Sequence, residues 1–280
     1  MSARMVLVQG QQPTSGTAAI QVLDLTRRYD GLVAVDHLTF STQAASIFGL
    51  LGPNGAGKST LIKMLTTLLP PTEGTALVAG FDIRRQPKKV RSCIGYVSQM
   101  LSADGELSGY ENLLISAKLY GIPRPERQAR IEEALQFMDL AGASKRLVKQ
   151  YSGGMIRRLE IAQSMLHRPH VLFLDEPTIG LDPVAKRSVW ERISDLREQF
   201  STAILITTHD MEEADVLCDQ VAFLHHGRIA GLGSPDELKA QVSPHATLND
   251  VFIQFTGASI AEEGALRDVQ RTRRLARRLE

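Results

Sequence analysis

A stretch of eight residues, 52–59, has the composition of a loop that binds phosphate groups. It reads Gly-Pro-Asn-Gly-Ala-Gly-Lys-Ser and fits the pattern G-x-x-x-x-G-K-S/T. Glycine lets the backbone approach phosphate oxygens closely, while consecutive N–H groups and the N terminus of a following helix supply partial positive charge. Lys58 can neutralise the terminal phosphates of a triphosphate, and the Ser59 hydroxyl can ligate Mg²⁺. A Gly-rich turn that binds nothing is the alternative interpretation.

Two adjacent carboxylates come directly after a second apolar stretch. Asp175 and Glu176 end the run 171–174, and ligands of parallel sheets bind outside the carboxyl ends of the strands. Because neighbouring side chains on a strand point to opposite sides, the two acids can have different roles. We expect Asp175 to hold Mg²⁺, through water, and Glu176 to be the base that polarises the attacking water. The alternative is a helix cap before Pro177.

Short apolar runs predict the strands that must carry these residues. The expected strands are 47–51, 94–97, 171–174, 203–207 and 221–224. Helical spacing predicts helices over 58–69, stopped by Pro70-Pro71, and over 153–167, 184–200 and 211–217. Strands that alternate with helices are typical of the α/β class, with a mostly parallel sheet covered on both sides.

Other segments depart from this alternation or extend it. Residues 20–25 and 32–40 alternate apolar and polar side chains on either side of Asp30-Gly31, which predicts an N-terminal antiparallel β region. Residues 109–141 have helical character, with helices expected over 111–120 and 126–140, so an α-helical subdomain is inserted at about 100–155. Ser234-Pro235-Asp236-Glu237 is a capping box that starts a later helix.

The overall composition is ordinary. Hydrophobic residues make up 43% and charged residues 22%, and the formal net charge of +1 gives no general attraction to nucleic acid. No apolar run reaches the roughly 18–20 residues that cross a bilayer, so work at a membrane would require a partner. Cys93 and Cys218 are expected to be reduced thiols, although a lone pair could form a bridge.

With these motifs in this order, the chain resembles the nucleotide-binding subunit of ATP-binding cassette (ABC) transporters. It looks most similar to the drug-resistance (daunorubicin-type) export branch, and the resemblance covers about residues 18–256. The further motifs that carry it are Gln99 (Q-loop), residues 152–154 (core of the signature), residues 180–182 (D-loop), His209 (switch histidine) and residues 249–252 (end of this branch).

The resemblance implies roles for individual residues. Those expected at ATP are Tyr29, Gly52, Pro53, Asn54, Gly55, Ala56, Gly57, Lys58, Ser59, Thr60, Ser152, Gly153, Gly154 and Asp182. Those expected in catalysis are Glu176, His209, Lys58 and Gln99, and those expected at Mg²⁺ are Ser59, Gln99 and Asp175. Tyr29 would stack on adenine, and Ser152 would face the γ-phosphate bound by a second subunit.

Each of these assignments has a plainer alternative. Tyr29 could be an ordinary strand aromatic, Gln99 a solvated strand end, and His209 a core or capping histidine. Ser152 with its two glycines could be an N-cap. The signature also departs from the family pattern, because many members have Leu in place of Tyr151 and Gln in place of Met155. We expect function to persist, since the Ser hydroxyl and the backbone donors remain. The segment before residue 47 lacks the usual Gly-containing turn, which affects a local loop shape.

The resemblance further implies a P-loop NTPase core and an ATP-hydrolysing motor subunit. Its partners would be a second copy, or a paired ATPase subunit, with ATP at the interface, and a separate membrane-spanning permease subunit. It would lie peripherally on the cytoplasmic side of the cell membrane and power export of a drug-like, lipid or glycan substrate. No nucleic acid partner is expected. The alternatives are a soluble ABC ATPase acting on ribosomes or DNA, and a non-transporting regulatory ATPase.

Three parts of the chain are expected. They are a flexible N-terminal tail at 1–17, an ABC ATPase domain at 18–240, and a C-terminal extension with a basic end at 241–280. The basic end carries Arg267, Arg271, Arg273, Arg274, Arg277 and Arg278. It could be a solvated helix end, or it could contact acidic lipid headgroups or an acidic partner.

Overall fold

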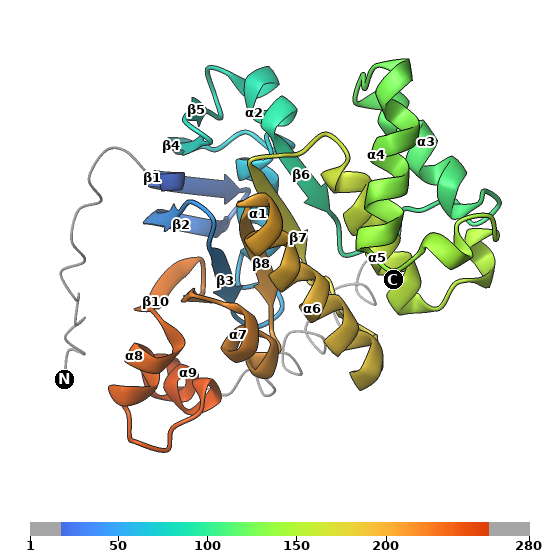
Figure 1. The fold of residues 1–280 in the computed structure, drawn as a ribbon. Coiled ribbons are helices and arrows are strands. Elements are labelled where there is room, and N and C mark those ends of the chain that lie inside the picture. Colours follow the sequence, from blue (N-terminus) through green and yellow to red (C-terminus); the bar gives the residue numbers. More distant parts are fainter. Residues whose placement is uncertain (1–17, 258–280) are drawn as a thin grey trace, which may run out of the picture.

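The computed structural model describes residues 18–257, which form two sheets and the helices around them (Figure 1). The first sheet has the strand order β2-β1-β4-β5, and its neighbouring strands are all antiparallel. Its strands are β1 (Ala18–Tyr29), β2 (Leu32–Gln43), β4 (Glu73–Val78) and β5 (Phe81–Asp82). The predicted antiparallel region and its turn at Asp30-Gly31 are confirmed, while β4 and β5 were not predicted.

The second sheet has the strand order β10-β9-β3-β8-β7-β6, and only the pair β9–β10 is antiparallel. Its strands are β3 (Ile47–Leu51), β6 (Ile94–Val97), β7 (Val171–Asp175), β8 (Ala203–Thr208), β9 (Gln220–His225) and β10 (Arg228–Gly233). Every residue of β3, β7 and β8 is buried, as expected for central parallel strands. The predicted mostly parallel sheet is confirmed.

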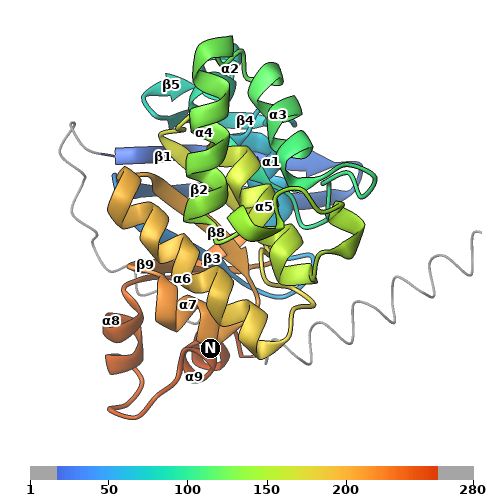
Figure 2. The same cartoon turned by 45° about the vertical axis from the view of Figure 1, so that its right-hand side comes forward.

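Helices cover both faces of the parallel sheet (Figures 1 and 2). They are α1 (Lys58–Leu65), α2 (Pro87–Cys93), α3 (Gly109–Leu119), α4 (Arg124–Phe137), α5 (Gly153–Met165), α6 (Pro183–Phe200), α7 (Met211–Leu217), α8 (Pro235–Ala240) and α9 (Leu248–Thr256). Two short 3₁₀ turns, Ala141–Ala143 and Val148–Gln150, precede α5. Helices α3 and α4 lie side by side at one end of the molecule, beyond β6.

Alternate residues of the central strands pack into two separate hydrophobic cores. Leu172 and Leu174 of β7 pack in a core with α5 and α6, whereas Val171 and Phe173 pack with α1 and the antiparallel sheet. This alternation follows from the two-residue period of a strand. The parallel sheet is therefore held from both sides, which fixes the edge where β3, β7 and β8 end.

Several predicted helices end earlier than expected. Helix α1 ends at Leu65 and not at residue 69, because Thr67 adopts a left-handed φ of 63° and the Leu69 N–H bonds back to the Lys63 carbonyl. Asp139 has a φ of 53° and α4 likewise ends at Phe137. Helix α5 ends at Met165, two residues before the predicted end, and the chain reverses at Arg168 with a φ of 55°.

Some features fall outside these comparisons. The predicted tail at 1–17 and the basic end at 265–280 lie outside the described residues. Within the described residues, Cys93 and Cys218 are free and buried. No helix over residues 18–257 has the length and apolar character to cross a bilayer.

Candidate active site

The loop between β3 and α1 is shaped by glycines that no other residue could replace without strain. Gly52 has a φ of 153° and Gly57 a φ of 113°. A Cβ at Gly52 would collide with the carbonyl oxygen of Leu224, and one at Gly57 with the carbonyl oxygen of Ala34. The loop thus winds closely against β9 of the parallel sheet and β2 of the antiparallel sheet and leads directly into α1, a geometry suited to phosphate binding.

The ammonium group of Lys58 is enclosed by this loop. Its Nζ donates to the carbonyl of Gly52 at 2.6 Å and to that of Pro53 at 3.3 Å, and it lies 3.3 Å from Glu176 Oε1. Only 5% of the side chain is exposed. Burial lowers the pKa of Lys58, and the nearby Glu176 carboxylate opposes that shift. A cation held among loop carbonyls beside a helix N terminus fits a polyphosphate.

Asp175 lies at the end of β7, between the phosphate loop and β8. Its Oδ1 accepts a hydrogen bond from Thr207 Oγ1 at 2.6 Å and one from Ser59 Oγ at 3.3 Å. Strand register places Asp175 opposite Thr207. Ser59 and Asp175 therefore present neighbouring oxygen donors, the donor type that Mg²⁺ prefers, so this pair fits the metal ion.

Three side chains from distant segments converge on the Glu176 carboxylate. Oε1 faces Lys58, while Oε2 accepts from Gln99 Nε2 at 3.4 Å and lies 3.3 Å from His209 Nδ1. Glu176 has a left-handed φ of 49°, and its N–H donates to Thr207 Oγ1 at 3.0 Å. We call Lys58, Gln99, Glu176 and His209 the Glu176 cluster.

The charges of this cluster favour an ionised carboxylate. Burial raises the pKa of Glu176, but the hydrogen bond from His209 and the charge of Lys58 outweigh burial, and the net shift is downward. The hydrogen bond to Glu176 raises the pKa of His209, against an opposing effect of burial. An ionised carboxylate that is 7% exposed and held by three donors is able to accept a hydrogen bond from water.

Comparison with known proteins decides the family. The family model described as ABC transporter matches residues 35–179, which include the phosphate loop and the Glu176 carboxylate. The chain belongs to this family.

Relatives of this ABC transporter chain have related functions. It is 44% identical to the daunorubicin/doxorubicin resistance ATP-binding protein DrrA of Streptomyces peucetius over 82% of this chain and 69% of that protein. It is 38% identical to the probable multidrug ABC transporter ATP-binding protein YbhF of Escherichia coli, over 86% of this chain but only 42% of that protein. The chain is an ATP-binding and ATP-hydrolysing subunit of an ABC transporter. Neither relative supports the alternative of an ATPase acting on ribosomes or DNA.

The fold agrees with this assignment. A solved ATP-binding subunit of an ABC transporter superposes with a TM-score of 0.75 at 28% identity, covering 85% of this chain and 99% of that one. The predicted P-loop NTPase core is therefore confirmed.

The signature segment, residues 151–155, contains the N-cap and the first residues of α5. The hydroxyl of Ser152 caps this helix by accepting from the Met155 N–H at 3.3 Å. Ser152 and Gly153 are exposed, whereas Gly154 packs so closely on α6 that a Cβ would lie 3.0 Å from that of Ala185. The structure thus presents a hydroxyl and a helix N terminus to the outside.

Tyr151, one of the two departures from the family pattern, has a structural role. It is buried, and its hydroxyl donates to the carbonyl of Ala143 at 2.8 Å. A Cβ on Gly109 would collide with this hydroxyl, so the glycine at the start of α3 accommodates the tyrosine. Tyrosine therefore connects the signature segment to the inserted helices by a hydrogen bond that leucine could not make.

Two other predicted ligand residues lie apart from the Glu176 cluster. Tyr29 ends β1, is 44% exposed, and has the Arg27 guanidinium 4.7 Å above its ring. Asp182 caps α6 by accepting from the N–H groups of Val184 and Ala185, both at 3.0 Å. The capping role of Asp182 was not predicted.

The sequence interpretation missed a buried carboxylate beside this site. Glu213 on α7 is 1% exposed, and its Oε1 accepts from Thr178 Oγ1 at 2.6 Å and from Trp190 Nε1 at 2.8 Å. Burial raises the pKa of Glu213. The sequence does not distinguish Glu213 from its neighbour Glu212, because the two acids differ only in the side of α7 on which they lie.

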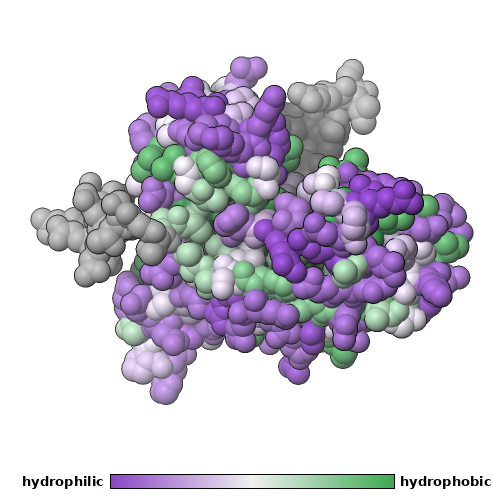
Figure 3. All heavy atoms as spheres, turned by 45° about the horizontal axis from the view of Figure 1, so that its top comes forward, coloured by the Kyte–Doolittle hydropathy of each residue, from purple (hydrophilic) through white to green (hydrophobic). Residues whose placement is uncertain are grey.

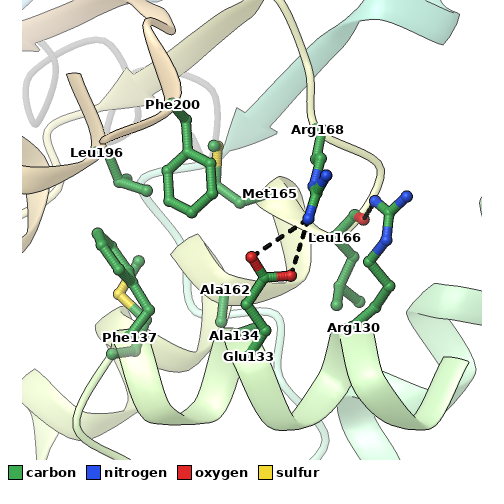
Figure 4. Close-up of a pocket in the computed structure, with 11 residues that line it drawn as sticks. Arg130, Glu133, Ala134, Phe137, Ala162, Met165, Leu166, Arg168, Leu196 and Phe200 are labelled. Carbon is green, nitrogen blue, oxygen red and sulfur yellow. Dashed lines mark hydrogen bonds and ion pairs between the residues drawn. The ribbon is translucent and has the colours of Figure 1, made fainter. Parts of the chain in front are cut away.

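A different hollow lies away from the site. It is framed by α4, α5 and α6, with apolar side chains such as Phe137, Met165 and Phe200 on its walls (Figure 4). At its rim, Arg168 Nη2 pairs with Glu133 at 3.0 Å. None of the predicted site residues lines this hollow.

Proposed function

We propose that the Glu176 cluster hydrolyses ATP and that the phosphate loop, residues 52–59, with Thr60, holds its phosphates. Glu176 accepts a hydrogen bond from the attacking water and directs it at the γ-phosphate, while Lys58 and His209 contact the phosphate oxygens. Ser59, Asp175 and Gln99 would hold Mg²⁺, which would supply neutralisation of the phosphate charge. The convergence of Lys58, Gln99 and His209 on one buried carboxylate carries this proposal.

A second ATPase chain completes the site in this proposal. Ser152, Gly153 and Gly154 face the γ-phosphate bound by the partner, and Asp182 lies at the same interface. The exposure of Ser152 and its place at the N terminus of α5 support this, because a helix start with an exposed hydroxyl is suited to an anion. The arrangement is a homodimer, or a pair with another ATPase subunit, with ATP between the chains. Tyr29 stacks on adenine.

A membrane-spanning permease subunit is the other proposed partner. Met100 and Leu101, which follow Gln99 directly, are 80% and 54% exposed and offer apolar contact next to the site. One face of the molecule, shown in Figure 3, is mostly hydrophilic, with interspersed apolar patches. The chain would bind the permease from the cytoplasmic side as a peripheral subunit. Motion of the inserted helices would then be transmitted to it.

The transported substrate is proposed to be drug-like, with lipids and glycans as the further classes. DrrA is a daunorubicin/doxorubicin resistance protein and YbhF a probable multidrug transporter protein, and both similarities support export of drug-like compounds. Residues 18–240 are proposed as the ATPase domain and 241–280 as an extension. Within that extension, Phe252 of α9 packs on Phe223 of β9 with ring centroids 5.7 Å apart.

The test of this proposal replaces the acid by its neutral isostere. In the full chain, Glu176→Gln should lower kcat for ATP hydrolysis at least about 100-fold, since general-base catalysis contributes that much, and change ATP affinity by less than about 3-fold. Glu191→Gln, an exposed position on α6, is the matched control and should behave as wild type. Near-normal hydrolysis by Glu176→Gln would refute the role of Glu176.

A further inference from the structure

A buried arginine on α5 holds the backbone of the segment that carries Gln99. Arg157 Nη1 donates to the carbonyl of Ser98 at 2.7 Å, and Nη2 donates to the carbonyl of Gln99 at 3.0 Å. Only 3% of the Arg157 side chain is exposed. The forked guanidinium thus holds two successive carbonyls, which a lysine ammonium could not do with the same geometry.

A buried glutamate one turn later holds the other end of the same segment. Glu160 Oε1 accepts from the Ser102 N–H, from the Ser102 hydroxyl at 3.1 Å and from the Ala103 N–H at 3.3 Å. Glu160 Oε2 lies 3.1 Å from Arg157 Nη1, and 3% of its side chain is exposed. The pair therefore grips residues 98–103, which we call the Q-segment, from both ends.

Separating Arg157 and Glu160 from the Q-segment would cost considerable free energy. Removing one partner of a buried ion pair leaves an uncompensated charge, which is far more costly than losing a surface contact. Arg157 and Glu160 pair their charges, and each also hydrogen-bonds backbone groups of the Q-segment, so moving the Q-segment would leave buried polar groups of both residues without partners. Since α5 begins at the signature segment, a movement of Ser152 must be accompanied by a movement of the Q-segment.

We propose that Arg157 and Glu160 are positioning residues for ATP hydrolysis, which hold Gln99 against Glu176 and couple the signature segment to Gln99. This inference rests on the role of Gln99 in the proposed function. Neither residue touches the reacting atoms. Their effect is transmitted through the backbone of the Q-segment, which they hold in the place where Gln99 Nε2 reaches Glu176 Oε2.

A double-mutant cycle tests whether Arg157 acts through Gln99. In the full chain, Arg157→Met and Gln99→Ala should each lower kcat about 10-fold, with KM for ATP within about 2-fold of wild type. The double variant should be at most about 2-fold slower than the slower single variant, because both substitutions remove the same contribution of Gln99 to hydrolysis. Multiplied losses, about 100-fold, would overturn this inference alone. Unchanged kcat in Gln99→Ala would refute the role of Gln99 and, with it, this inference.

The neighbouring arginine provides the matched control. Arg158 donates to the carbonyl of Met138 at 2.9 Å and lies 3.5 Å from Asp139, contacts that hold α4 and not the Q-segment. Arg158→Met should lower kcat less than Arg157→Met, and its loss should multiply with that of Gln99→Ala. If adding Arg158→Met to Gln99→Ala lowers kcat no further than Gln99→Ala alone, the specific role of Arg157 is overturned.

A second measurement does not depend on activity. Glu160→Gln keeps the shape and one carbonyl oxygen but removes the charge, so the chain should fold. Amide hydrogen exchange in residues 98–104 should become about 10-fold faster in this variant, while exchange in β7 and β8 stays as in wild type. Unchanged exchange in residues 98–104 would show that the pair does not hold the Q-segment and would overturn the inference.

Discussion

The Glu176 cluster and the signature segment differ in how complete they are within one chain. In the cluster, Lys58, Gln99 and His209 meet a carboxylate that is 7% exposed, and every contact is supplied by the same chain. At the signature segment, Ser152 is exposed and its hydroxyl bonds to the first turn of its own helix. In one region the polar groups are paired within the fold, and in the other a hydroxyl and a helix N terminus face the surface.

A single chain identifies the partners of buried polar groups but not those of exposed ones. Buried groups must be satisfied inside the fold, so their partners can be identified in a single chain. Exposed N–H groups at a helix N terminus can bond to water. The structure of a single chain therefore does not identify the group that binds there. We therefore expect changes in the cluster to act within one chain, and changes at the signature segment to act across two.

The largest effect is expected from removing the loop cation. Lys58→Met should weaken ATP binding about 10- to 100-fold, the size of a lost charge-assisted hydrogen bond, and lower hydrolysis more strongly still. Equilibrium binding of ATP and steady-state hydrolysis measure the two effects. Lys63→Met, exposed on the same helix, is the control and should leave both unchanged. Equal ATP affinity in Lys58→Met and wild type would contradict the phosphate role of Lys58.

A smaller and different effect is expected at the signature segment. Ser152→Arg places a long cation where a neighbouring chain would approach, and we expect hydrolysis to fall about 100-fold through misalignment, with ATP affinity within about 3-fold. Ser243→Arg, at an exposed position after α8, is the control. Wild-type hydrolysis by Ser152→Arg would count against a site shared between chains.

Mixing two inactive variants sharpens the comparison. A dimer of Ser152→Arg with Glu176→Gln contains one site in which the phosphate loop, the carboxylate and the facing serine are all intact. Random pairing of equal amounts should therefore restore about a quarter of the wild-type sites. Measured hydrolysis should rise on mixing in proportion to the mixed dimer. No recovery, although mixed dimers form, would indicate that each chain works with its own signature segment.

The smallest effect concerns pH. The hydrogen bond to Glu176 raises the pKa of His209, so the stabilisation is fully present below the ordinary histidine pKa of about 6.5 and is lost as pH rises through the higher folded value. Because the His209 side chain is 42% exposed, we expect less than about 1 kcal/mol. Denaturation at pH 6 and pH 8 should show this loss in wild type but not in His209→Gln. His245→Gln, at an exposed position, should keep the wild-type difference.

Features that depend on residues close together in the sequence could be predicted from it. The phosphate loop was predicted from residues 52–59 because its glycines and Lys58 act within eight positions. The central strands were predicted because burial on both faces leaves continuous apolar runs. The end of α1 was not, since the turn at Thr67 depends on one backbone conformation before the expected stop at Pro70.

The sequence by itself determined the family, the phosphate loop, the alternation of strands and helices, and the candidates at positions 99, 176 and 209. Tertiary structure alone decided that Gln99 and His209 meet at the Glu176 carboxylate, that Thr207 bonds Asp175, and that Arg157 and Glu160 hold the backbone on both sides of Gln99. The physical reason is that local patterns report how each segment meets water or core. Hydrogen bonds between residues separated by 32 to 77 positions exist only after packing has brought the segments together.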